Sequence, residues 1–163
     1  MNFDVKEFHL NDWLTQLNKK CELMIKQDNR LFEPMDIPEV LANYTCLIDA
    51  ERMDQLFSNL ISNAVKHTEE NTGIISFNVT LLEPNQVLIQ VSDNGFGIDK
   101  ENLPFIFDRF FKRTSLTEVD GTGLGLPIVK QIVASHHGDI WAESEENEGT
   151  IFYILLPINK REE

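Results

Sequence analysis

The chain has 163 residues, enough for one domain with a sizeable core, and its 42% hydrophobic and 25% charged residues are typical of a globular protein. Aspartate and glutamate number 27 against 14 lysines and arginines, so the net charge is −13 and a nucleic-acid-binding surface is not expected. An anionic ligand would need a local device, such as backbone N–H groups, a few cations or a metal. We expect no membrane-spanning helix and no secretory signal. Two cysteines, Cys21 and Cys46, indicate free thiols rather than a disulfide framework.

The N-terminal part of the chain predicts two helices with a strand between them. Apolar residues recur at helical spacing over 11–29, and Asn11 or Asp12 is the expected N-cap. A strand is expected over 40–48. The residue after it, Asp49, is a suitable N-cap for the second helix.

The rest of the chain predicts strands that alternate with shorter helices. The expected elements are strands over 74–82 and 87–92 with a turn at 83–86, a short helix over 100–106, a polar mobile loop over 114–120, a helix through about residue 136, and a hairpin of strands over 139–144 and 150–157. Hairpins imply antiparallel pairing. We therefore predict an α+β fold, a two-layer sandwich whose mixed, mostly antiparallel sheet is covered on one face by three helices.

The second helix carries polar residues along one edge of its apolar face. An apolar stripe spans residues 53–65, and Asn59, Asn63 and Lys66 follow its border three or four residues apart. A solvated helix edge is the simple interpretation of the two asparagines. The alternative is a Mg²⁺ site, because an amide oxygen is a hard ligand and phosphate oxygens and waters complete such a shell. Lys66 could then contact a phosphate as a point charge.

Two glycine-rich loops follow. Asp93-Asn94-Gly95-Phe96-Gly97 comes directly after a strand, where a carboxylate can accept a hydrogen bond from the amino group of adenine but not from the oxygen of guanine. Gly121-x-Gly123-x-Gly125 precedes a helix, and its N–H groups form an anion site that needs no positive charge. Its spacing is that of neither a P-loop nor a dinucleotide fingerprint. Taken alone, both motifs are weak signals, and the Asp93–Gly97 loop is also compatible with a tight turn.

Between these loops lies a segment, residues 105–113, that combines four phenylalanines with Arg109, Lys112 and Arg113. It is either a satellite hydrophobic cluster or a lid whose cations neutralise phosphate.

Together and in this order, these elements resemble the N, G1, F, G2 and G3 boxes of bacterial sensor histidine kinases. Residues 59–67 read NLISNAVKH, close to the family pattern NLxxNAxK, and residues 121–126 read GTGLGL as in the family. Residues 135–141, SHHGDIW, resemble the family's AHGGxIW, and a late Gly149-Thr150 follows. The resemblance covers about residues 39–157.

This resemblance implies the Bergerat (GHKL) ATPase fold, with ATP bound under a flexible lid. By position, Asn63 would ligate Mg²⁺ with Asn59 beside it, Lys66 would contact the phosphates, and Asp93 would hold the adenine amino group. The implied ATP-binding residues are Asn59, Asn63, Lys66, His67, Asp93, Gly95, Gly97, Ile98, Arg109, Lys112, Gly121, Thr122, Gly123, Leu124, Gly125, Leu126 and Thr150, of which Asn59, Lys66 and Lys112 are the implied catalytic residues.

Two positions depart from the family pattern. Lys112 stands where the family more often has arginine, so a bidentate phosphate contact becomes a single-point contact. His137 replaces the usual first glycine of the AHGG turn.

Sensor kinases transfer the γ-phosphoryl group to a histidine of a separate helical hairpin, in a motif similar to H-[DE]-x-x-x-P. None of the four histidines here lies in such a motif. We therefore expect residues 39–158 to be the ATP-binding core, residues 1–38 an N-terminal part of the same domain that enters from a dimerisation domain, and residues 159–163 a charged tail. The expected partners are ATP, that phosphohistidine domain and the receiver domain of a response regulator, in the cytoplasm, with the parent protein anchored in a membrane into which this fragment does not insert.

Two alternatives remain open. The same fold could serve an ATPase clamp or a serine-directed anti-sigma kinase, although the phenylalanine-rich segment and GTGLGL favour the histidine kinase branch. A binding module that no longer holds nucleotide is the other alternative, and the intact motif residues argue against it.

Overall fold

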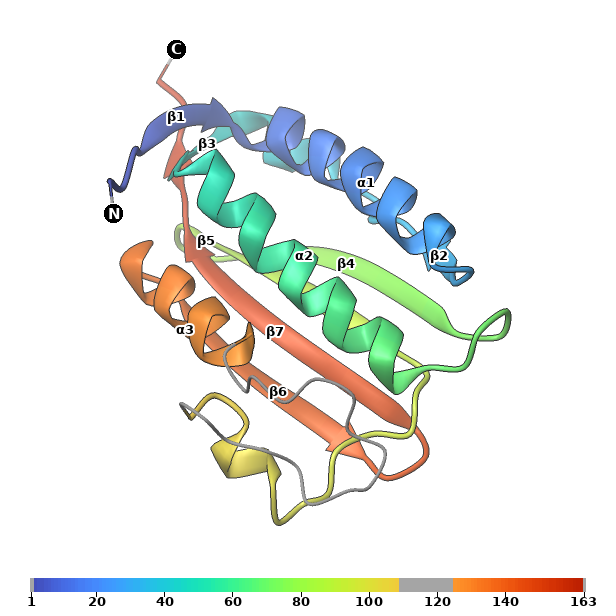
Figure 1. The fold of residues 1–163 in the computed structure, drawn as a ribbon. Helices are drawn as coiled ribbons and strands as arrows, with labels where there is room; N and C mark the ends of the chain where they lie inside the picture. Colours follow the sequence, from blue (N-terminus) through green and yellow to red (C-terminus); the bar gives the residue numbers. More distant parts are fainter. Residues whose placement is uncertain (1, 109–124, 163) are drawn as a thin grey trace.

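The computed structural model describes residues 2–108 and 125–162, which form two packed layers (Figure 1). The helices and strands are β1 (Lys6–His9), α1 (Leu10–Gln27), β2 (Leu31–Glu33), β3 (Tyr44–Ile48), α2 (Ala50–His67), β4 (Ile74–Leu82), β5 (Gln86–Asp93), α3 (Gly125–Ser135), β6 (Asp139–Glu145), β7 (Gly149–Pro157) and β8 (Asn159–Lys160), with short 3-10 helices η1 (Glu39–Asn43) and η2 (Leu103–Phe105). Among these described residues, no helix is long and apolar enough to cross a membrane.

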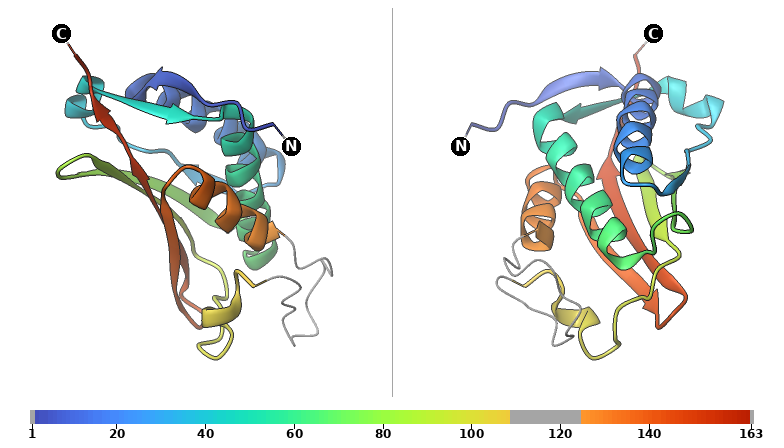
Figure 2. Two further views of the ribbon diagram at one scale, coloured as in Figure 1. Left: turned by 90° about the vertical axis from the view of Figure 1, so that its left-hand side faces the viewer. Right: turned by 45° about the vertical axis from the view of Figure 1, so that its right-hand side comes forward.

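The main sheet has the strand order β2-β4-β5-β7-β6. The β2–β4 pair is parallel and every other pair in this sheet is antiparallel. Helices α1, α2 and α3 lie against one of its faces (Figures 1 and 2). The predicted α+β sandwich, with a mixed and mostly antiparallel sheet under three helices, is thus confirmed.

The core lies between the sheet and the helices because alternate strand residues point to that side. In β5, Val87, Ile89 and Val91 are buried while the residues between them are half-buried on the other face. They meet the apolar stripe of α2, where Leu56 and Leu60 are almost fully buried. This packing fixes the orientation of α2, and with it the edge that carries the asparagines.

A second sheet, with the order β1-β3-β8, was not predicted. Its outer strands have four and two residues, too few for an alternating pattern. The predicted strand over 40–48 is wrong in its first part, because η1 occupies residues 39–43. Pro38, with φ −60°, begins that turn, and its carbonyl accepts from Leu41 N–H at 3.0 Å.

The helix ends agree in part with the predictions. Asp49 is the N-cap of α2 and accepts a hydrogen bond from Arg52 N–H at 3.2 Å, as predicted. The N-cap of α1 is His9, because β1 runs directly into the helix, so the prediction of Asn11 or Asp12 was wrong. The short helix predicted over 100–106 is reduced to η2. The loop predicted over 114–120 lies outside the described residues.

The two histidines that follow α3 differ in their structural roles. His137 has φ 61°, the left-handed conformation that favours glycine, which gives a physical reason for the family's glycine at this position. His136 is buried, and its Nε2 accepts a hydrogen bond from Asp49 N–H at 3.0 Å while Nδ1 donates to Ile132 O at 2.8 Å. His136 therefore joins the end of α3 to the beginning of α2.

Candidate functional site

The edge of α2 that carries the two asparagines faces the beginning of α3. Asn59 Nδ2 donates to the carbonyl oxygen of Gly125, the first residue of α3, at 3.4 Å. The Nδ2 atom of Asn63 is buried and has no hydrogen-bond partner among the described residues. A buried amide group without a partner costs about 1–3 kcal/mol, so Asn63 is the residue on this edge that a ligand would satisfy.

The Asp93–Gly97 loop lies against the last turn of α2. Phe96 N–H donates to the carbonyl oxygen of His67 at 3.0 Å, and the two rings pack with their centroids 4.9 Å apart. A Cβ atom at Gly95 would lie 2.0 Å from the same carbonyl oxygen. The close approach of the two main chains therefore requires glycine at this position.

Asp93, the last residue of β5, points to the helix side of the sheet because it lies two residues after the buried Val91. Its Oδ1 accepts a hydrogen bond from Gly95 N–H at 2.8 Å, and the backbone of Thr150 bonds to it from the neighbouring strand. Burial nevertheless outweighs these bonds and raises the pKa of Asp93 to about 6. A carboxylate with this pKa is short of donors, and it can accept a hydrogen bond from an amino group.

The hairpin between β6 and β7 lies beside Asp93 and forms the next part of the site. Gly149 has φ 108°, and a Cβ atom there would lie 1.9 Å from the carbonyl oxygen of Asp93. Ser144 joins this hairpin to the glycine loop: its Oγ accepts from Ile98 N–H at 2.7 Å, donates to Gly149 O at 3.0 Å and lies 3.0 Å from Thr150 Oγ1. Ser144 was not among the predicted site residues, because a serine in a strand carries no local signal of this role.

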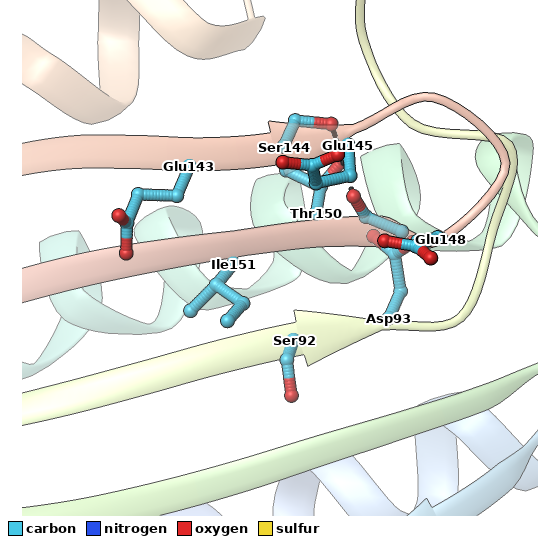
Figure 3. Close-up of a pocket in the computed structure, with 9 residues that line it drawn as sticks. Ser92, Asp93, Glu143, Ser144, Glu145, Glu148, Thr150 and Ile151 are labelled. Carbon is cyan, nitrogen blue, oxygen red and sulfur yellow. Dashed lines mark hydrogen bonds between the residues drawn. The ribbon is translucent and has the colours of Figure 1, made fainter.

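The other face of the sheet has a shallow hollow near the same strand ends (Figure 3). Its volume is about 380 Å³, and its lining includes the carboxylates of Glu143, Glu145 and Glu148. Strand alternation places Glu143, Ile151 and Ser92 away from the helices. Four acidic residues, with Asp93 at the border, make this hollow unsuitable for a triphosphate. The site on the helix side is therefore the candidate for an anionic nucleotide.

The structure brings together most of the residues that the motifs selected. They lie around the ends of α2 and β5 and the beginnings of β7 and α3: Asn59, Asn63, Lys66, His67, Asp93, Gly95, Gly97, Ile98, Gly125, Leu126 and Thr150. Outside the described residues lie Arg109, Lys112, Gly121, Thr122, Gly123 and Leu124. Within the described residues, no group of three or more His, Cys, Asp or Glu side chains could hold a metal ion.

Comparisons with known proteins agree with this geometry. The sensor histidine kinase WalK of Bacillus subtilis (strain 168) is 40% identical over 169 residues, which cover 99% of this chain and 27% of WalK. The solved catalytic domain of histidine kinase ThkA is 31% identical with a TM-score of 0.73, over 94% of this chain and 97% of that domain. ThkA in complex with the response regulator protein TrrA matches with 27% identity and a TM-score of 0.70, over 95% of this chain and 42% of that one.

The chain spans less than a third of the length of the sequence relatives WalK and the sensor protein RprX of Bacteroides fragilis (strain YCH46). The family model described as histidine kinase-, DNA gyrase B- and HSP90-like ATPase matches residues 48–160, from the end of β3 to β8. This match contains the edge of α2, the Asp93–Gly97 loop and the β6–β7 hairpin, which together form the site. The chain therefore belongs to the histidine kinase-, DNA gyrase B- and HSP90-like ATPase family, as a catalytic domain of the sensor histidine kinase type.

Proposed function

We propose that this chain binds Mg·ATP and transfers the γ-phosphoryl group to a histidine on a separate dimerisation domain. The observation that carries the proposal is Asp93, a half-buried carboxylate between two close main-chain approaches, whose pKa burial raises to about 6 in spite of two backbone hydrogen bonds. The amino group of adenine supplies such a donor, whereas guanine would present an acceptor. Gly95 and Gly149 keep the walls free of side chains, which suits a flat base.

The residues of α2 fit a magnesium ion that shares its shell with phosphates. The buried Nδ2 atom of Asn63 has no hydrogen-bond partner in the described part of the chain, and rotation of the amide presents its oxygen, a hard ligand, to the same space. Because the described residues lack a cluster of acidic ligands, the remaining positions would be filled by phosphate oxygens and water. When bound, the ion neutralises charge on the phosphates. Asn59 lies one turn before Asn63 and stands beside this position.

Phosphoryl transfer asks the protein for positioning and charge neutralisation rather than covalent chemistry. In this proposal Asp93 orients the base, Lys66 contributes a positive charge near the phosphates, and the N-terminus of α3 offers backbone N–H groups. Lys112 and the glycines at 121 and 123 are proposed to add a cation and further donors. None of the chain's four histidines lies in a phosphoacceptor motif, so the acceptor is assigned to another domain.

The wider context follows from the same proposal. Residues 39–158 would be the ATP-binding core, and residues 1–38 would enter from the dimerisation domain. The ThkA complex, which contains a response regulator, supports a receiver domain as partner. The domain would work in the cytoplasm as part of a membrane-anchored kinase.

Calorimetry with Mg²⁺ and a non-hydrolysable ATP analogue tests nucleotide binding. Asn63→Ala should weaken binding at least about tenfold in Mg²⁺, and the difference from the parent should shrink in EDTA. Asn78→Ala is the matched control, because Asn78 is exposed on β4, away from the site. No heat of association for the parent chain at millimolar nucleotide would refute the proposal. An equal effect of Asn63→Ala with and without Mg²⁺ would refute the metal assignment.

The acceptor is tested by mixing the chain with γ-labelled ATP and two candidate substrates. A helical hairpin with a phosphoacceptor histidine should gain acid-labile label, and an anti-anti-sigma protein with an acceptor serine should gain none. The isolated chain should not label itself. Acid-stable label on the serine substrate alone would favour the anti-sigma type of kinase instead.

A further inference from the structure

The guanidinium group of Arg30 is bound to the last turn of α2. Nη2 donates to the carbonyl oxygens of Val65 and Thr68, both at 2.8 Å, and Nε donates to Thr68 Oγ1 at 3.0 Å. The remaining contact, from Nη1, goes to the carbonyl oxygen of Asp28 at 2.7 Å. One side chain from the turn between α1 and β2 thus binds two carbonyls at the end of α2, of which the Val65 carbonyl also accepts from Thr68 N–H at 3.3 Å.

The two residues between these carbonyls are Lys66 and His67, which the proposed function places against the nucleotide. The opposite side of the same turn is held by Phe96, whose N–H donates to the His67 carbonyl oxygen at 3.0 Å. The last turn of α2 is therefore clamped from two directions, by the glycine loop and by Arg30. Rotation or fraying of this turn would displace both side chains from the phosphates.

The use of an arginine here differs from an ordinary surface ion pair. In an acidic chain, the Arg30 guanidinium forms no ion pair with a carboxylate among the described residues. Its charge instead meets the negative end of the α2 dipole. Its planar group also holds two carbonyls and a hydroxyl at once, which the single ammonium group of lysine does not reproduce.

Main-chain hydrogen bonds hold the turn between α1 and β2 against the loop that follows α2. Leu31 N–H donates to Gly73 O at 2.8 Å, and Asn71 N–H donates to Asn29 O at 2.9 Å. Both segments lie at the same end of the molecule (Figure 1). These backbone bonds do not depend on the Arg30 side chain, so its removal should leave the α1–β2 turn in place and remove only the guanidinium contacts from the end of α2.

From these contacts we infer that Arg30 is a positioning residue for phosphate binding, acting through the turn that carries Lys66 and His67. The inference rests on the proposed function. It extends the site to a residue from the N-terminal α1–β2 region, outside the match to the family model. Adenine is assigned to Asp93, at the end of β5. Arg30 should therefore affect the binding of the phosphates and not the binding of the base.

The test compares the affinities for Mg·ATP and for adenosine, measured by calorimetry. Arg30→Met should weaken Mg·ATP binding about tenfold and leave adenosine within about twofold, because a clamp of charged hydrogen bonds at a helix end is lost. Arg30→Lys should lie between, about threefold weaker for Mg·ATP, since one point charge replaces the fork. Lys20→Met is the matched control: it removes a cation of α1 that binds Asp54 of α2 at 3.0 Å, far from the last turn, and should change neither affinity.

A double variant separates positioning from general stability. In a Lys66→Ala background, Arg30→Met should cost clearly less than the roughly tenfold that it costs in the parent, because one of the two contacts that it positions is already absent. Unchanged Mg·ATP affinity in Arg30→Met, or equal losses for Mg·ATP and adenosine, would overturn the inference. If circular dichroism shows that Arg30→Met does not fold, Arg30→Lys decides by the same ratio of affinities. A parent chain that binds neither ligand would refute the proposed function instead.

Discussion

Adenine recognition by Asp93 predicts a specific dependence of affinity on pH. The amino group of adenine needs an acceptor, so the competent form of Asp93 is the ionised one. Burial raises the pKa of Asp93 to about 6 in the nucleotide-free chain, so protons compete with the ligand below this value. The affinity for the base should therefore fall as the pH is lowered through 6 and should be nearly constant above 7.

The size of the effect follows from the pKa. At pH 7 about nine-tenths of Asp93 is ionised, and at pH 5 about one-tenth is. The dissociation constant should therefore rise about tenfold between these values, equivalent to about 1.4 kcal/mol. Adenosine is the better ligand for this measurement, because it lacks phosphates that titrate in the same range and its ring titrates well below it.

The assay is calorimetry of adenosine at half-unit steps of pH from 5 to 8, with the parent chain and with Asp93→Asn. The variant should bind more weakly, and its affinity should not change with pH over this range. A parent affinity that is independent of pH, or a variant that binds adenosine as tightly as the parent at pH 7, would refute the assignment of Asp93 to adenine.

The same pKa predicts the opposite effect on stability. Because the folded pKa lies above the ordinary value of 3.8, Asp93 contributes most stability below pH 4, and this contribution is lost as the pH rises through 6. At pH 7 the free chain with Asp93→Asn should be more stable by about 1–3 kcal/mol, a rise in Tm of several degrees. Equal melting temperatures at pH 7, with no change in the difference down to pH 4, would contradict this reasoning.

Two further substitutions test the backbone of the site and of α3. Gly149→Ala should destabilise the fold by about 2–4 kcal/mol in urea unfolding, because the new Cβ meets the Asp93 carbonyl oxygen at a positive φ. Gly125→Ala is the control: no atom of the described residues lies within 4 Å of its added Cβ, so stability should change by less than about 1 kcal/mol. His137→Gly should stabilise the chain by about 1 kcal/mol at unchanged ATP affinity, since φ is 61° there, and a loss of stability would show that the imidazole makes a compensating contact.

The elements that the sequence predicts well are those whose pattern is local and long. Helix α2 has 18 residues, carries an apolar stripe of period 3.6 over residues 53–65 and begins at a capping aspartate, so both its face and its start are predictable. The central strands alternate over eight or nine residues. By contrast, β1 and β8 have too few residues for a period, and they become strands only by pairing with β3.

Some residues of the site are likewise predictable from the sequence, and others are not. The aspartate, glycine and asparagine motifs are readable because each combines a chemical group with a short fixed spacing. Ser144 and Arg30 are not, because their partners lie 46 and 38 residues away and no local pattern marks them. Such residues become visible only when the fold brings Ser144 to the amide of Ile98 and Arg30 to Thr68.

The glycines around Asp93 and its raised pKa have one physical cause. The main chains of the β6–β7 hairpin, the glycine loop and the end of α2 approach so closely that a Cβ atom would lie within about 2 Å of a carbonyl oxygen at two positions. The same closeness leaves the carboxylate half-buried and partly shielded from water, and its two backbone hydrogen bonds do not compensate. The free site therefore holds an acceptor that water cannot fully satisfy, and a flat base with an amino group can. Affinity for adenine and reduced stability of the empty domain at neutral pH are thus two consequences of one arrangement, which is why we expect Asp93→Asn to change them in opposite directions.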